Sequence, residues 1–279
     1  MRVSPLLAIL TFIALFPARP ARAATEIPFA YREGMICLKV GVAGQPAPLN
    51  FLLDSGAGAT VLDLQTARRL GVKLGSRETV QGIQGRCTAC RVDGLAANVA
   101  TIPIARSVLA LDLSPVSQGC GSRIDGLLGA DFFHGRIVQI DFAAQKIRVL
   151  TRGEVSTAGA QIVPLATRND ALCIRVGVNG NAPQWMRFDT GCSSALEWVA
   201  GSSAARKDTR TSIATATGSR RTIQTEVTLG SERFAAVKTG LHDEPMFAGE
   251  AGLLGNGLLS QFRVTVDAAK SQLFLTRIK

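Results

Sequence analysis

Histidine, tyrosine and long apolar runs are scarce in this chain of 279 residues, and each scarcity excludes a class of protein. The two histidines, His134 and His242, lie far apart and near no cysteine pair. A zinc site needs about four ligands, so we expect no metal and no other cofactor. Neither histidine has a nucleophile-elbow sequence nearby, which argues against Ser-His-Asp chemistry.

Aromatic residues make up only 5% of the chain, and its positive charge is scattered. The formal net charge is +10, but its densest clusters are short pairs such as Arg68-Arg69 and Arg220-Arg221. Nucleic-acid-binding proteins usually carry a basic stripe. We therefore interpret the charge as a solvated basic surface and expect no nucleic-acid partner.

Beyond the N-terminus, no stretch reaches the roughly 18 apolar residues of a transmembrane helix. Residues 1–23 have the pattern of a signal peptide: the basic start Met1-Arg2, the apolar run Leu6 to Phe16, and the small-x-small sequence Ala21-Arg22-Ala23. This pattern predicts an exported protein, periplasmic or secreted, without stable membrane insertion after signal removal. A retained membrane anchor is the alternative.

Six cysteines in an exported chain suggest some disulfide bonds. Cys37 and Cys173 lie in strand-like runs and are candidates for buried free thiols. Cys87-x-x-Cys90 could be a redox pair or half a metal site. Because it follows Gly-rich sequence and precedes a hairpin-like segment, we prefer a structural disulfide or local staple, with Cys120 as a possible partner. The sixth cysteine is Cys192.

The remainder of the chain repeats one order of segments twice. Residues 37–44 (CLKVGVAG) match residues 173–180 (CIRVGVNG) in residue type at every position except the seventh, and both alternate as a strand does. Each run leads to an Asp-hydroxyl-Gly triplet. Further on, GLLG at 126–129 recurs at 252–255, and VQID at 138–141 pairs with VTVD at 264–267.

Ordered matches in register predict two homologous lobes, residues 24–155 and 156–279, after a signal peptide at 1–23. Abundant glycine and dispersed Val, Ile and Thr favour an all-β fold. One clear helix is expected, over Leu62 to Leu70.

The repeated triplets are Asp54-Ser55-Gly56 and Asp189-Thr190-Gly191. A single triplet of this kind is typical of a β-turn. Here an apolar run leads into each Asp, and a pseudo-twofold axis between the lobes would bring the two carboxylates side by side. Such a pair shares one proton, so one Asp can act as a base towards water while the other protonates a carbonyl oxygen.

These residues resemble those of the aspartic proteases, the superfamily of pepsin-like and retropepsin-like enzymes. The match includes both triplets and the downstream motifs Leu127-Leu128-Gly129 and Leu253-Leu254-Gly255. The resemblance implies two β-barrel lobes with a cleft between them, the dyad Asp54 and Asp189, support from Ser55, Gly56, Thr190 and Gly191, and a ψ-shaped turn at each Leu-Leu-Gly. It also implies a flap near Gly82-Ile83-Gln84-Gly85.

The sequence departs from the family at two places. Pepsin-like enzymes carry a Tyr on the flap, whereas Tyr31 of this chain precedes the first triplet. Many also have a Ser or Thr after each triplet, where this chain has Ala57 and Cys192. Losing a hydroxyl donor to the carboxylate raises the pKa values of the dyad, so we expect an activity optimum less acidic than that of pepsin.

The sequence thus predicts a monomeric aspartic endopeptidase that hydrolyses an extended peptide or protein without a covalent intermediate. A peptide-binding or scaffold protein that kept the fold but hydrolyses poorly is the main rival. A thiol-disulfide protein built on Cys87 and Cys90 is a third interpretation.

Overall fold

The computed structural model describes residues 24–82, 85–199 and 221–278, so the predicted signal peptide lies outside the described residues. Strands dominate its first half: β1 (Thr25–Pro28), β2 (Ala30–Arg32), β3 (Met35–Val42), β4 (Leu49–Leu53), β5 (Val61–Asp63), β6 (Arg77–Gly82), β7 (Gly85–Val92), β8 (Ala97–Val99), β9 (Ile102–Pro103), β10 (Val108–Leu111), β11 (Gly126–Leu128), β12 (Ile137–Asp141) and β13 (Lys146–Leu150). Helices α1 (Leu64–Arg69) and α2 (Ser114–Gly119) and the 3₁₀ turns η1 (Ala130–Phe133) and η2 (Arg152–Glu154) interrupt them.

The second half is built in the same way. Its strands are β14 (Ala160–Arg168), β15 (Ala171–Val178), β16 (Gln184–Asp189), β17 (Leu196–Val199), β18 (Arg221–Leu229), β19 (Glu232–His242), β20 (Gly252–Gly255), β21 (Phe262–Asp267) and β22 (Gln272–Arg277), with helix α3 (Asn256–Leu259) and the 3₁₀ turn η3 (Ala268–Lys270).

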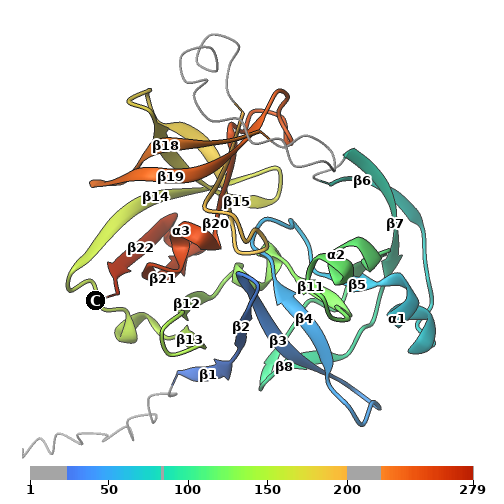
Figure 1. The fold of residues 1–279 in the computed structure, drawn as a ribbon. Helices are drawn as coiled ribbons and strands as arrows, with labels where there is room; N and C mark the ends of the chain where they lie inside the picture. The colour runs from blue at the N-terminus through green and yellow to red at the C-terminus, as the bar shows by residue number, and fades with distance from the viewer. Residues whose placement is uncertain (1–23, 83–84, 200–220, 279) are drawn as a thin grey trace, which may run out of the picture.

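The strand pairings of the two halves correspond. In the first, β11 lies parallel to β4 and antiparallel to β5, and β10 lies parallel to β5. In the second, β20 lies parallel to β16 and antiparallel to β17, and β19 lies parallel to β17. Figure 1 shows the two groups of strands on opposite sides of the molecule, blue to green and yellow to red. The all-β, two-lobed fold expected from the internal repeat is confirmed, while the lobe boundary at residues 155 and 156 stays a prediction.

A sheet shared by both halves, with strand order β1-β13-β12-β21-β22-β14, joins the lobes. At its centre β12 pairs with β21, and Val138 faces Val266 while Ile140 faces Val264. In the repeat VQID/VTVD, Val138 corresponds to Val264 and Ile140 to Val266, so these two pairs exchange under a twofold rotation. The pseudo-twofold axis therefore passes between β12 and β21.

The alternation of the strands explains the core. In β3 the side chains of Ile36, Leu38 and Val40 are buried, while the alternating Cys37 and Lys39 are partly and fully exposed. Apolar residues from both halves form one continuous cluster. A smaller cluster of Leu52, Val61, Leu113 and Ile124 adjoins the start of α2. The expected helix over 62–70 is present as α1, where Asp63 caps the N-terminus by accepting a hydrogen bond from the Thr66 N–H at 2.9 Å.

All six cysteines are free thiols, so the expected disulfide bonds are absent. The staple between Cys87 and Cys90 was a wrong prediction, because both residues lie in one strand, β7. Cα atoms three residues apart in a strand are separated by about 10 Å. A disulfide requires less than about 7 Å. The same strand also excludes a redox motif at the start of a helix.

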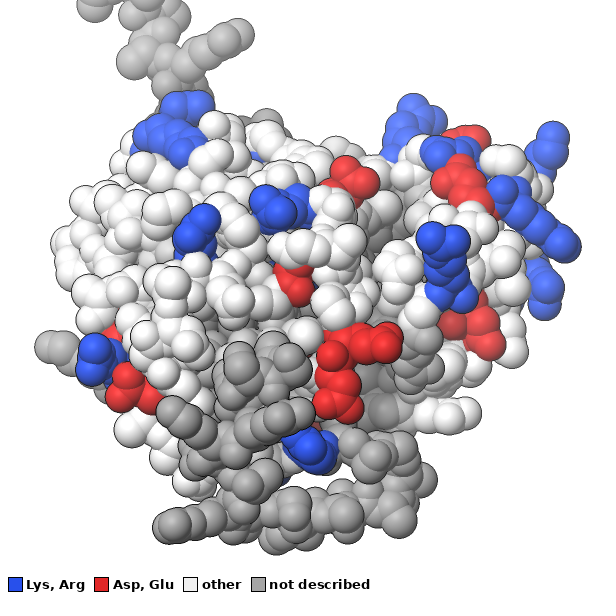
Figure 2. Space-filling view, turned by 90° about the horizontal axis from the view of Figure 1, so that it is seen from above, with Lys and Arg blue, Asp and Glu red and all other residues white. Residues whose placement is uncertain are grey.

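The surface supports the interpretation of the charge as dispersed. Figure 2 views the molecule from the end at which β6 and β18 lie in Figure 1, and positive and negative side chains alternate over this face without forming a stripe. Among the described residues, no helix is both long enough and apolar enough to cross a membrane.

Candidate active site

The two aspartates stand at equivalent strand ends. Asp54 follows β4, and its N–H donates to the Leu128 carbonyl of β11 at 2.9 Å. Asp189 ends β16, where it pairs with Gly255 of β20. Strand β4 is mostly buried and apolar, and the last four residues of β16 are buried, so each strand delivers a carboxylate to the middle of the molecule.

The structure brings these carboxylates together. A Cβ atom added to Gly56 would lie 2.5 Å from the Cγ of Asp189, and one added to Gly191 would lie 2.5 Å from the Cγ of Asp54. Real Cβ atoms essentially never approach so closely, so each aspartate needs a glycine in the opposite triplet. The two glycines also donate their N–H groups to the Asp of their own triplet, at 3.1 Å for Gly56 and 2.8 Å for Gly191.

Ser55 and Thr190 lock the two triplet loops to each other. The Ser55 hydroxyl donates to the Phe188 carbonyl at 2.7 Å, and the Thr190 hydroxyl donates to the Leu53 carbonyl at 2.9 Å. Each hydroxyl in turn accepts the backbone N–H of the other residue at 3.0 Å. All these groups are buried, so the four bonds fix the distance between the aspartates.

Each Leu-Leu-Gly motif pairs with the strand that leads to an aspartate. Leu127 and Leu128 pair with Leu52 and Leu53 of β4. Leu253 and Leu254 pair with Arg187 and Phe188 of β16. Beyond each motif the chain closes back onto the triplet loop: the Ala130 N–H, just after Gly129, donates to Ala57 at 2.7 Å, and the Asn256 N–H, just after Gly255, donates to Cys192 at 2.8 Å.

Burial and mutual repulsion perturb the two carboxyls unequally. Burial raises the pKa of Asp54, although N–H donors from Ala57 and Gly56 stabilise its charge. Burial, followed by the negative charge of Asp54, raises the pKa of Asp189 well above its ordinary value. Asp189 is only 4% exposed. Two carboxyls this close hold one proton between them over a range of pH, which is the state required for acid–base catalysis on water.

A buried ion pair next to the dyad was missed at the sequence level. Arg187, two residues before Asp189, donates two hydrogen bonds of 2.8 Å to Glu250 and a third of 2.7 Å to the Gly56 carbonyl. Its guanidinium also stacks on the ring of Phe247, with its Cζ atom 3.3 Å from the ring centroid. The signal was present in the repeat, because Arg187 occupies in β16 the place of Leu52 in β4.

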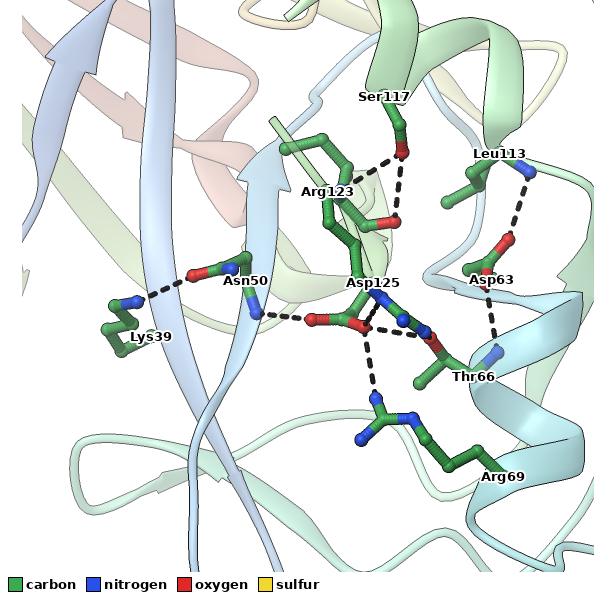
Figure 3. Close-up of polar contacts among 10 residues, drawn as sticks. Lys39, Asn50, Asp63, Thr66, Arg69, Leu113, Ser117, Arg123 and Asp125 are labelled. Carbon is green, nitrogen blue, oxygen red and sulfur yellow. Dashed lines mark hydrogen bonds and ion pairs between the residues drawn. The ribbon is translucent and has the colours of Figure 1, made fainter. Parts of the chain in front are cut away.

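A cluster of polar side chains around Asp125, shown in Figure 3, was also not predicted from the sequence, and it stabilises the start of β11. Asp125, directly before β11, accepts hydrogen bonds from the Asn50 N–H of β4 at 3.0 Å and from the Thr66 hydroxyl of α1 at 2.8 Å. The guanidinium groups of Arg123 and Arg69 lie 2.9 and 3.2 Å from the same carboxylate. Burial favours the neutral acid, but these donors outweigh it and lower the pKa of Asp125. Asp125 thereby ties β4 and α1 to the strand beneath Asp54.

Asp131 has a similar role inside the first lobe. Its carboxylate accepts the N–H of Thr60 at 3.0 Å and the Thr60 hydroxyl at 2.8 Å, and the Thr60 hydroxyl in turn accepts the Gly129 N–H at 3.2 Å. In the second lobe Asn256 instead donates to the Thr190 carbonyl at 2.7 Å and the Gly34 carbonyl at 2.8 Å. The segments that follow Gly129 and Gly255 thus differ in sequence because different hydrogen bonds hold each of them to its triplet loop.

The predicted flap coincides with a hairpin. Strands β6 and β7 pair as far as Gly82 and Gly85, while Ile83 and Gln84 at the tip lie outside the described residues. The assignment of Gly82, Ile83, Gln84 and Gly85 as a flap therefore stays a prediction. Tyr31 is not part of this hairpin, because its ring packs edge-on against Phe142 at 5.4 Å between centroids.

Other places in the described chain do not compete with the dyad as a catalytic site. A groove of about 600 Å³ runs along β3, β8 and β9 and is lined mainly by backbone and small side chains, with neither aspartate in it. Within the described ranges, no group of three or more His, Cys, Asp or Glu side chains is placed to hold a metal ion.

Comparisons with known proteins agree with this geometry. Residues 38–132 match the family model described as aspartyl protease. A crystal structure of an aspartic proteinase from Irpex lacteus has the same fold, with a TM-score of 0.58 and 15% sequence identity over 92% of this chain and 98% of that one. No curated protein matches the sequence. The matched segment contains the first triplet and its ψ-turn, so the first lobe is similar in sequence to aspartyl proteases, and the fold shared with the Irpex lacteus enzyme extends over both lobes.

Proposed function

We propose that the protein is an aspartic endopeptidase that hydrolyses peptide bonds with water activated by Asp54 and Asp189. One observation carries the proposal: the half-buried carboxyl of Asp54 and the buried carboxyl of Asp189 lie beside the Ser55–Thr190 network, and each requires a glycine in the other's loop. A protein family assignment alone says only that a protease ancestor existed. The retained geometry supports activity in this chain.

The proposed reaction needs one shared proton and no covalent intermediate. The ionised carboxylate removes a proton from a water molecule held between the two groups, and the resulting hydroxide adds to the peptide carbonyl carbon. The protonated carboxyl gives its proton to the carbonyl oxygen. When the tetrahedral intermediate collapses, the C–N bond breaks and the leaving nitrogen takes the proton that the first carboxyl gained from water. One hydroxyl of the intermediate gives its proton back to the other carboxyl, which restores the singly protonated dyad.

The substrate we propose is an extended peptide or protein segment. Two lobes in one chain supply both aspartates, so the enzyme would work as a monomer. A signal peptide over residues 1–23 would direct it out of the cytoplasm, to the periplasm or the medium. The loss of the N-terminal segment would remove Arg2, Arg19 and Arg22 and leave a net charge of +7, that is 10 − 3.

The test uses purified protein and a mixed peptide library assayed across pH, beside Asp54→Asn and Asp189→Asn. Both variants keep the size and most hydrogen-bonding capacity of the side chain but cannot exchange the proton. We expect each to lose at least about a thousandfold in kcat/KM. Cleavage that survives either substitution would refute the dyad, and peptide binding without cleavage by wild type would favour the scaffold alternative.

A further inference from the structure

Arg187 breaks the symmetry between the lobes directly beside the dyad. It pairs with Leu253 in the register in which Leu52 pairs with Leu127, so Leu52 and Arg187 are equivalent positions. Leu52 lies in an apolar cluster, whereas Arg187 is a buried cation held by Glu250 in a two-pronged ion pair. A buried charge pair costs desolvation energy, so its presence beneath one aspartate calls for a functional explanation.

The third hydrogen bond of Arg187 crosses to the other lobe and ends on the peptide group that serves Asp54. Arg187 donates to the carbonyl oxygen of Gly56 at 2.7 Å. The N–H of the same peptide unit belongs to Ala57, and it donates to the Oδ1 atom of Asp54 at 3.0 Å. A cation on the oxygen of a peptide polarises its N–H and strengthens the bond that the N–H donates.

The equivalent peptide in the other lobe has no such arrangement. The Leu52 side chain has no donor with which to reach the Gly191 carbonyl. Both N–H groups donate to the backbone oxygen of their own Asp, Ala57 at 3.1 Å and Cys192 at 3.3 Å, but only the Ala57 N–H also donates to the carboxylate among the described residues. Among the described residues, the Asp189 carboxylate thus receives a backbone N–H only from Gly191, while the Asp54 carboxylate receives two.

We propose that Arg187 is a positioning residue that acts through the Gly56–Ala57 peptide to keep Asp54 as the ionised base and leave the shared proton on Asp189. The inference rests on the proposed function, since it divides the two roles of that reaction between named residues.

Few other ionisable groups of the described chain face this cluster. Arg168 of β14 and Cys173 of β15 lie near Arg187 and Glu250, and Cys192 lies near Asp189 and Glu197. Burial raises the pKa of both thiols to about 12, so they stay neutral throughout the range in which the dyad titrates. A change in that titration on altering Arg187 is therefore not produced by either cysteine.

The experiment combines spectroscopy of the whole mature chain with kinetics. The main variant is Arg187→Met with Glu250→Met, which replaces the ion pair by apolar side chains of similar length and leaves no buried charge unpaired. Two readouts come from NMR: the chemical shift of the Ala57 amide proton, with that of Cys192 as internal control, and the pH titration of the two Asp carboxyl carbons. The third readout is kinetic, the acid limb of the pH profile of kcat/KM.

We expect the Ala57 amide proton to move upfield and that of Cys192 to stay in place. The first apparent pKa of the dyad, which we assign to Asp54, should rise by about one unit, and the midpoint of the acid limb of kcat/KM should move to higher pH by the same amount. Glu250→Gln should do the opposite, because it keeps the bond from Arg187 to Gly56 and removes the negative charge beside it, so the first ionisation should fall.

The proposal is overturned if the double variant is as stable to heat as wild type and yet shows the wild-type Ala57 resonance and the wild-type titration of the two Asp carboxyls. If the double variant does not fold, Glu250→Gln decides, and an unchanged or raised ionisation in that variant overturns it. Failure of wild type to cleave any peptide would refute the proposed function, whereas the spectra would still show whether Arg187 biases the proton.

Discussion

Ser55 and Thr190 each donate a hydroxyl to the carbonyl that precedes the aspartate of the other lobe, and each accepts the other's backbone N–H. Both side chains are fully buried. Water therefore cannot replace either hydroxyl, and the two triplet loops are held as one unit.

We expect Ser55→Ala to lower the free energy of unfolding by about 2–3 kcal/mol, because it leaves the Phe188 carbonyl and the Thr190 N–H buried without a partner. Urea denaturation measures the loss. Thr190→Ser, which keeps the hydroxyl, is the matched control and should stay within about 1 kcal/mol of wild type. Equal stability of Ser55→Ala and wild type would show that the network contributes nothing to folding.

Gly191→Ala should separate the carboxyls, since the new Cβ would stand 2.5 Å from the Cγ of Asp54. A displacement of this order at reacting groups costs about a hundredfold in kcat/KM. The control is Gly153→Ala, where nothing lies within 4 Å of the added atom. Full activity in Gly191→Ala would mean that the loops can move apart without penalty.

The raised pKa of Asp189 predicts how stability depends on pH. A carboxyl whose pKa is raised on folding adds stability that is complete below its ordinary value of 3.8 and is lost as pH rises through the folded pKa. Wild type should therefore become less stable from about pH 4 towards neutral pH, by about 1.4 kcal/mol for every pH unit that separates the folded pKa from the unfolded one. Asp189→Asn should flatten this decline in chemical denaturation curves, and parallel curves would contradict the assignment.

Catalysis should follow the same groups in a bell-shaped profile. We expect activity to appear as Asp54 ionises and to disappear as Asp189 loses its proton, so the raised pKa of Asp189 should shift the alkaline limb of the profile to higher pH. We expect the maximum of kcat/KM to lie well above about pH 2, where an unburied pair of carboxyls would begin to ionise. A maximum in that strongly acidic range would be inconsistent with the burial of the dyad.

Thiol labelling should separate the six cysteines by exposure and charge. Cys87 is exposed and should react first. Cys173 and Cys192 should react last, because burial raises the pKa of each thiol to about 12 and the thiolate is the reactive form. Mass spectrometry after timed alkylation of the native protein identifies the order, and early labelling of Cys192 would show that its surroundings open readily.

The fold and the proximity of Asp54 and Asp189 were predictable from sequence because duplication leaves a pattern that one chain displays twice. The repeats at 37–44 and 173–180, the triplets and the Leu-Leu-Gly motifs determined the order of the strands around each aspartate. The Arg187–Glu250 pair was not predictable in this way, because its members lie far apart and Glu250 belongs to no motif. The arginine itself could have been noticed by comparing β4 with β16, where a cation replaces Leu52.

The cysteines show the opposite error, because a disulfide was predicted that the structure does not contain. The spacing of Cys87 and Cys90 suggested a local staple, but spacing alone does not say whether a segment is extended. Along a strand, two residues three apart point to opposite faces. Only the pairing of β6 with β7 reveals this geometry, and it depends on partners elsewhere in the chain.

The pairing of β12 with β21 joins two copies of one ancestral pattern within a single polypeptide. Two identical subunits meeting at such an axis would have to carry the same residue at both sides, hence two arginines at the position of Leu52 and Arg187, or none. Two lobes in one chain are free of that constraint, because a mutation in one lobe leaves the sequence of the other unchanged. Under the proposed function, the continuity of the chain is what would let one aspartate specialise as a proton acceptor and its twin as a proton donor.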